Sequence, residues 1–171
     1  MKTRSRFFFI ALSMLLFSVV VQSCKKTPAP TTSTPPTTSA PSFSFIALGI
    51  TTTGVQYTVT NTMPSGPLQI TASNAANNSN YQTVQITLNN AVTSPGTFTL
   101  SPSLSNTGLY TSGSNTIKYS TNATNVGTIT ITKVDMVNNL MSASYNFVAQ
   151  QYSPTIGNSG TISGSFTNVG F

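Results

Sequence analysis

Side chains that could do acid–base or nucleophilic chemistry are scarce in this chain of 171 residues. It has no histidine and no glutamate, a single aspartate, Asp135, and a single cysteine, Cys24. Glycoside cleavage needs two carboxylates, serine hydrolysis needs a Ser-His-Asp set, and a zinc site needs several Cys, His or carboxylate ligands. None of these sets can be assembled. We therefore expect a protein that is not an enzyme, with no catalytic residue, no cofactor and no metal site.

A serine activated by Lys118 or Lys133 is the one nucleophilic arrangement that this composition leaves open. Lys133 stands two residues before Asp135, in a segment that alternates like a strand, so both side chains fall on one face. An ordinary surface ion pair between these two residues is the favoured interpretation.

The cysteine follows an apolar stretch and precedes a polar one. Lys2, Arg4 and Arg6 form a basic segment, and the apolar residues 7–21 come directly after it. This order is typical of a secretory signal peptide, which we assign to residues 1–23. A permanent membrane helix is the alternative, but residues 7–21 would reach only about 22 Å, less than the roughly 30 Å of the hydrocarbon core.

Val21-Gln22-Ser23-Cys24 resembles the bacterial lipobox, although Gln22 departs from the small residue usual at its position. The resemblance implies a diacylglyceryl thioether on the Cys24 sulfur and a fatty acyl group such as palmitate on the new amino terminus. Each buried CH₂ contributes about 0.8 kcal/mol, so two or three chains hold a protein firmly on a bilayer. The alternatives for an odd cysteine are a buried thiol or an intermolecular disulfide. Its place between a signal and a linker favours lipid attachment.

Residues 24–42 consist of Cys24 and the linker KKTPAPTTSTPPTTSAPS, which has no large apolar side chain. Such a segment cannot offset the entropy of ordering, so we predict a proline-stiffened tether. At about 3.1 Å per residue it reaches roughly 55 Å. It serves as a spacer or is an inert leftover.

Charge is nearly absent beyond the linker. Without residues 1–23, the chain keeps Lys25, Lys26, Lys118 and Lys133 against Asp135. Nucleic-acid binding needs clustered Lys and Arg to displace counterions from phosphates, and no such cluster exists. We therefore expect no nucleic-acid partner.

Residues 43–171 alternate between apolar and polar side chains with a period of two. Val84, Ile86 and Leu88 share one face, for example, while Thr83 and Thr87 lie on the other. This alternation predicts strands with one buried face. The predicted strands are 43–47, 55–60, 67–73, 83–89, 96–100, 117–121, 128–135, 141–149 and 162–166. We expect a single all-β, antiparallel domain of about eight or nine strands, either a β-sandwich or barrel-like, in which 128–135 and 141–149 form a hairpin.

Three blocks of this domain resemble successive blocks of a family of uncharacterised Bacteroidetes lipoproteins of the DUF6252 type. The blocks are SPGTFTLS (94–101), GTITITKVDMVNNLMSASYNFVA (127–149) and GTISGSFTNV (160–169), and the resemblance covers roughly residues 68–171. Ala143 departs from the glycine usual in the hairpin, and Tyr57 stands near where relatives often carry tryptophan. The resemblance implies an exported lipoprotein with an all-β domain and no assigned activity.

Two functions remain open for a noncatalytic, lipid-anchored envelope protein. The first is a structural or protein-interaction role. The alternative is a binding module for an uncharged ligand such as a glycan, with tyrosine rings as stacking platforms. The candidate rings are Tyr57, Tyr81, Tyr110, Tyr119 and Tyr152. Tyrosines in an all-β chain are more often strand residues that cover the edge of the core, and we favour that interpretation. Surface-exported lipoproteins of the phylum that the chain resembles tend to carry acidic residues just after the cysteine, and the residues directly after Cys24 include none. The resemblance therefore implies the outer membrane with the domain facing the periplasm, and the cell surface is the alternative.

Overall fold

The computed structural model describes residues 39–53, 55–61, 66–74, 81–113 and 116–171. Cys24, residues 1–23 and most of the predicted linker lie outside this part. The described part forms eleven strands and a short 3-10 helix. In chain order they are β1 (Ser42–Ala47), β2 (Ile50–Thr53), β3 (Gln56–Asn61), β4 (Leu68–Ser73), β5 (Gln82–Leu88), β6 (Gly96–Leu100), η1 (Pro102–Leu104), β7 (Thr107–Ser112), β8 (Ile117–Ser120), β9 (Gly127–Asp135), β10 (Leu140–Ser153) and β11 (Ser159–Gly170). None of the residues so described belongs to a helix long and apolar enough to cross a membrane.

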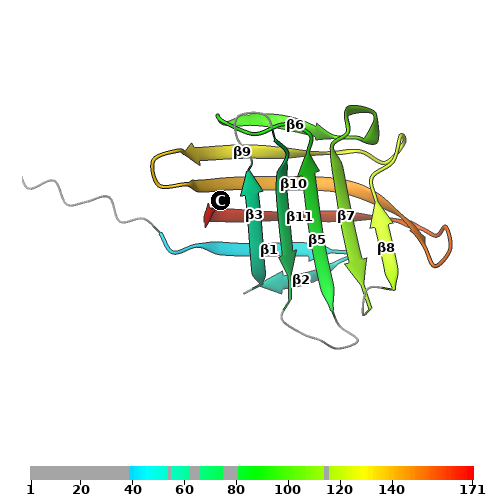
Figure 1. The fold of residues 1–171 in the computed structure, drawn as a ribbon. Helices are drawn as coiled ribbons and strands as arrows, with labels where there is room; N and C mark the ends of the chain where they lie inside the picture. Colours follow the sequence, from blue (N-terminus) through cyan, green and yellow to red (C-terminus); the bar gives the residue numbers. More distant parts are fainter. Residues whose placement is uncertain (1–38, 54, 62–65, 75–80, 114–115) are drawn as a thin grey trace, which may run out of the picture. The chain divides into compact units, whose positions relative to one another are not determined.

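All these strands belong to one antiparallel sheet, which branches at β10. Its main path runs β2-β1-β11-β10-β8-β7-β5-β4-β3, and β9 and β6 form a second branch. The 14-residue strand β10 pairs with β9 over Leu140–Phe147 and with β8 near its other end, from Gln150 to Ser153. The sheet curls, so that β3, β5 and β7 run across β1, β10 and β11 (Figure 1). The expected all-β antiparallel fold is confirmed, and the curled sheet forms a half-barrel.

The core lies on the concave side of the curled sheet. The apolar residues of the alternating strands fill it, as predicted from the sequence. Val84, Ile86 and Leu88 of β5 are buried, while the residues between them are partly exposed. Phe43 of β1 connects the aromatic side chains: its ring centroid lies 5.2 Å from that of Phe166 and 6.1 Å from that of Tyr57. Because these residues come from β1, β3 and β11, the cluster joins distant parts of the curled sheet.

The branch point is built around close packing on Phe147 of β10. Gly127 is its partner on β9, and a Cβ on Gly127 would lie 2.3 Å from the Cα of Phe147. Gly108 of β7 lies against the Phe147 ring, and a Cβ on Gly108 would lie 2.9 Å from the ring atom Cδ2. On the β8 side, Asn122 Nδ2 donates a hydrogen bond of 2.7 Å to Gln150 Oε1. Two glycines thus permit the close packing at the branch point, and a hydrogen bond between two amides connects β10 to the segment after β8.

Asn168 of β11 binds three other segments, and we call this group of contacts the Asn168 node. Its backbone N–H donates to Ser142 Oγ of β10 at 2.9 Å, and its Oδ1 accepts a bond of 3.1 Å from Lys133 Nζ of β9. Its Nδ2 donates to the carbonyl oxygen of Ser39 at 3.0 Å and to Ser39 Oγ at 2.8 Å. The node therefore fixes the point at which the chain enters the β domain.

Every strand predicted from the sequence overlaps an observed one, and the 128–135/141–149 hairpin is confirmed as β9 and β10. Two strands were missed. The edge strand β2 has the sequence ITTT and is mostly exposed, so it shows no apolar alternation. In β7 a glycine, Gly108, occupies a core position, because the Phe147 ring fills the space that a side chain would take.

Candidate functional site

The proposed lipid-attachment residue, Cys24, lies outside the described residues, so the site search concerns the β domain. The predicted ion pair between Lys133 and Asp135 is confirmed, with Nζ 3.9 Å from Oδ2. Asp135 also accepts hydrogen bonds from the side chain and backbone of Asn138 and from the N–H of Val137. These bonds, those from Asn138 first, lower the pKa of the Asp135 carboxyl, and the charge of Lys133 acts in the same direction. The carboxylate thus stabilises a turn.

The tyrosines do not form a stacking platform. Tyr110 is buried, which excludes it as a stacking ring and agrees with the favoured interpretation that the tyrosines are strand residues that cover the core. Tyr57 packs on Phe43, and Tyr119 packs on Tyr110 with centroids 5.8 Å apart. Tyr81 is partly buried, and Tyr152 is exposed. All six tyrosines of the chain lie in its described part, and no two exposed rings come together there.

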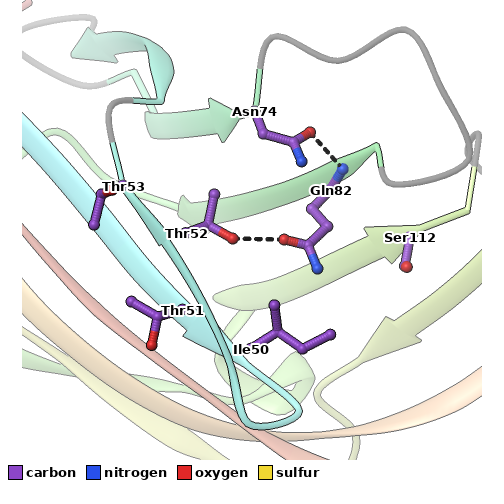
Figure 2. A pocket seen from close by; sticks show the side chains of 7 residues that line it. All are labelled: Ile50, Thr51, Thr52, Thr53, Asn74, Gln82 and Ser112. Atoms are coloured by element: carbon purple, nitrogen blue, oxygen red, sulfur yellow. Dashed lines mark hydrogen bonds between the residues drawn. The ribbon is translucent and has the colours of Figure 1, made fainter.

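A polar hollow of about 610 Å³ lies between edge strand β2 and the ends of β4, β5 and β7. Figure 2 shows it from close by. Its lining contains only uncharged side chains, most of them hydroxyls or amides: Ile50, Thr51, Thr52, Thr53, Asn74, Gln82 and Ser112. We call it the β2 groove. It exists because β2 pairs with β1 alone, so its other edge faces the curled end of the sheet.

Gln82 is the central polar residue of the β2 groove. Its side chain is 93% buried, since only 7% of the residue is exposed, and its Oε1 accepts a hydrogen bond of 2.6 Å from Thr52 Oγ1 across the groove (Figure 2). Its backbone N–H donates to Asn74 Oδ1 at 2.8 Å, and its carbonyl oxygen accepts from the Asn74 N–H at 3.1 Å. Thr52 of β2 therefore holds the Gln82 side chain, while Asn74, directly after β4, holds the Gln82 backbone.

The hydroxyl of Tyr110 belongs to the same network. Burial raises the pKa of this phenol, and hydrogen bonds from the side chains of Ser112 and Gln82 oppose that rise. Tyr110 thus contributes its polar end toward Gln82 and Ser112, while its ring belongs to the core. The network of hydroxyls and amides offers both donors and acceptors, and no side chain of the lining carries a charge.

This chemistry suits hydrogen bonding to an uncharged, hydroxylated ligand and does not supply a proton shuttle. Within the part of the chain that the structure describes, no group of three or more His, Cys, Asp or Glu could hold a metal ion. The sequence did not predict the groove, because Thr52, Gln82 and Ser112 stand some 30 residues apart and belong to no motif. The run ITTT was the one available signal, since it gives a four-residue segment three hydroxyl groups.

Fold and groove together define an all-β domain on a curled antiparallel sheet, with an uncharged polar hollow beside one edge strand. The chain belongs to the family described as Domain of unknown function (DUF6252), whose family model matches residues 49–170. The match begins in the β1–β2 turn, so it extends the resemblance seen in the sequence to include β2 and β3. No curated protein and no solved structure matches the chain.

Proposed function

We propose that this is a lipid-anchored, exported envelope protein whose β domain is noncatalytic and acts through contact with a protein or as a structural component. The anchor is the acylated sulfur of Cys24, in the outer membrane, with the domain in the periplasm. The observation that carries the proposal is the position of Cys24, directly after the apolar residues 7–21 and shortly before Ser39, where the chain enters the domain. The single aspartate, engaged in a turn, supports a noncatalytic role.

Replacing Cys24 by serine is expected to move the full-length protein from the membrane fraction to the soluble fraction. Serine keeps the size of the side chain but cannot form the thioether, and the loss of two or three acyl chains removes the anchor. Membrane fractionation and mass spectrometry of the mature amino terminus check this result. An unmodified thiol on Cys24 of the native protein would contradict the proposal. Protease added to intact cells tests the location, because cleavage of the domain would favour the cell surface.

The β2 groove favours a second candidate function, the binding of an uncharged ligand such as a glycan. A sugar hydroxyl needs both donors and acceptors, and the groove offers them from Thr52, Gln82 and Ser112 without a competing charge. Ile50, which is 57% exposed, adds an apolar surface at the rim for the C–H face of a sugar ring. This function is compatible with the lipid anchor and would act on the same tethered domain.

Calorimetric titration with a panel of neutral oligosaccharides tests this second function. Thr52→Val is expected to weaken binding about fivefold, the equivalent of one neutral hydrogen bond, because the isosteric side chain cannot donate to Gln82. Thr97→Val is the matched control, since Thr97 lies exposed on β6 and is not part of the groove lining. Equal affinity of both variants, or no binding by the native protein, would rule the groove out.

A further inference from the structure

The chain enters the β domain at one particular end of β10. Ser39 is hydrogen-bonded to Asn168, and Asn168 is in turn bonded to Lys133 near the end of β9. At the same end, the N–H of Phe171 donates to the carbonyl oxygen of Asn139 in the β9–β10 turn. Figure 1 shows the start of β1, the β9–β10 turn and the C-terminus on the same side of the domain. A tether from Cys24 therefore reaches the domain beside this turn.

The β9–β10 turn carries an apolar tip. Val137 is 90% exposed, the most exposed large hydrophobic residue of the described chain, and Met136 beside it is 37% exposed. Asp135 accepts hydrogen bonds from the backbone N–H groups of Val137 and Asn138, so its carboxylate is directed into the turn. Lys133 lies 3.9 Å from that carboxylate and balances its charge. The tip thus offers apolar side chains without a net side-chain charge behind them.

We propose that the Met136–Val137 tip rests in the interface of the bilayer that holds the lipid anchor, and so orients the domain. The inference rests on the proposed function, because it needs Cys24 to be acylated. The tip contact is then intramolecular, and a tether that spans at most roughly 55 Å raises its effective concentration, so a weak affinity is enough. The tip therefore contacts bilayer lipid, because the tether holds this end of the domain near the membrane.

The opposite end of β10 provides an internal comparison. The β10–β11 turn exposes Ile156 by 80%, and Tyr152 in the same end of β10 is 48% exposed. Strand β10 has 14 residues, so at about 3.3 Å per residue the two turns lie roughly 45 Å apart. Both tips are apolar and exposed, but only the β9–β10 tip lies where the tether joins. Apolar character alone predicts equal membrane contact at the two tips, whereas the tether predicts more frequent contact at the tip beside which it joins the domain.

Two single-tryptophan variants of the full, lipidated protein test the proposal, because the chain has no tryptophan of its own. Val137→Trp and Ile156→Trp are reconstituted in vesicles of phosphatidylethanolamine and phosphatidylglycerol with brominated acyl chains, which quench nearby indoles. We expect Val137→Trp to be quenched at least twofold more strongly than Ile156→Trp. Equal quenching of the two variants, or stronger quenching of Ile156→Trp, would overturn the proposal.

Backbone amide hydrogen exchange of the protein with its native side chains shows whether an introduced indole itself creates the contact. Peptides covering residues 136–140 are expected to exchange at least threefold more slowly on vesicles than in the Cys24→Ser protein in solution, while peptides covering 154–158 exchange equally. Unchanged exchange at 136–140 would overturn the proposal. Flotation separates the two ideas: a native protein that does not float with vesicles contradicts the lipid anchor, and one that floats with an unprotected tip contradicts the orientation alone.

Discussion

Replacing Gly127 by alanine is expected to lower the free energy of unfolding by about 3 kcal/mol and Tm by roughly 10 °C. A Cβ at this position would lie 2.2 Å from the Cβ of Phe147, 2.3 Å from its Cα and 2.4 Å from the carbonyl oxygen of Asn146. Two of these three atoms belong to the backbone of β10, so no side-chain rotation relieves the clash. The strand pair itself must separate, at the point where the sheet branches.

Gly96→Ala is the matched control for this prediction. Gly96 also lies in the second branch of the sheet, on β6, but a Cβ there would meet only the Phe98 ring, at an ordinary 3.6 Å. Its replacement should change the free energy of unfolding by less than about 0.5 kcal/mol. Denaturant unfolding of both variants followed by circular dichroism measures the difference. Similar stability of the Gly96 and Gly127 variants would mean that the close approach at the branch is not a constraint.

Nine of the eleven strands could be predicted, because apolar and polar side chains alternate along them in the local sequence. Val84, Ile86 and Leu88 alternate with polar residues, and the structure buries these three. The β9–β10 hairpin could be predicted for the same reason, with the turn-forming residues Asn138 and Asn139 between two alternating segments. The Lys133–Asp135 pair followed from spacing alone, since two residues two apart on a strand share a face.

The branching of the sheet could not be predicted, because it depends on what fits against Phe147. Gly108 and Gly127 are close to that residue in space, but the sequence shows them only as two separate glycines. The same is true of β7, where Gly108 replaces an apolar side chain on the core face and hides the strand pattern. A glycine that admits a neighbour's ring is indistinguishable in sequence from a glycine that permits a turn.

The two candidate sites also differ in whether consecutive residues of the sequence could reveal them. Cys24 could be proposed from consecutive residues, because a signal peptide and its cleavage site are read as a linear segment. The β2 groove depends on Thr52, Gln82 and Ser112, which only the curling of the sheet brings together. Tyr110 illustrates the difficulty: its type left open a stacking ring, and only the structure shows that the ring is buried and that its hydroxyl is directed toward Gln82.

Asn168→Ala is the second replacement for which a large effect is expected, again a loss of about 3 kcal/mol in the free energy of unfolding. The change removes the acceptor for the Lys133 ammonium and the donor to Ser39. Asn168 also has a φ of 48°, in the left-handed region that asparagine tolerates better than alanine. The start of the domain should therefore loosen, and limited proteolysis near Ser39 should become faster.

Two further variants separate the causes of that loss. Asn168→Gly removes the same hydrogen bonds but adopts the left-handed backbone without strain, so it should be about 1 kcal/mol more stable than Asn168→Ala. Asn146→Ala is the matched control, because Asn146 is an exposed asparagine on β10, and its loss should be within about 0.5 kcal/mol. If proteolysis near Ser39 stays slow in Asn168→Ala, the Asn168 node does not fix the chain entry. The orientation proposed for the membrane-bound domain would then lose its rigid connection to the tether.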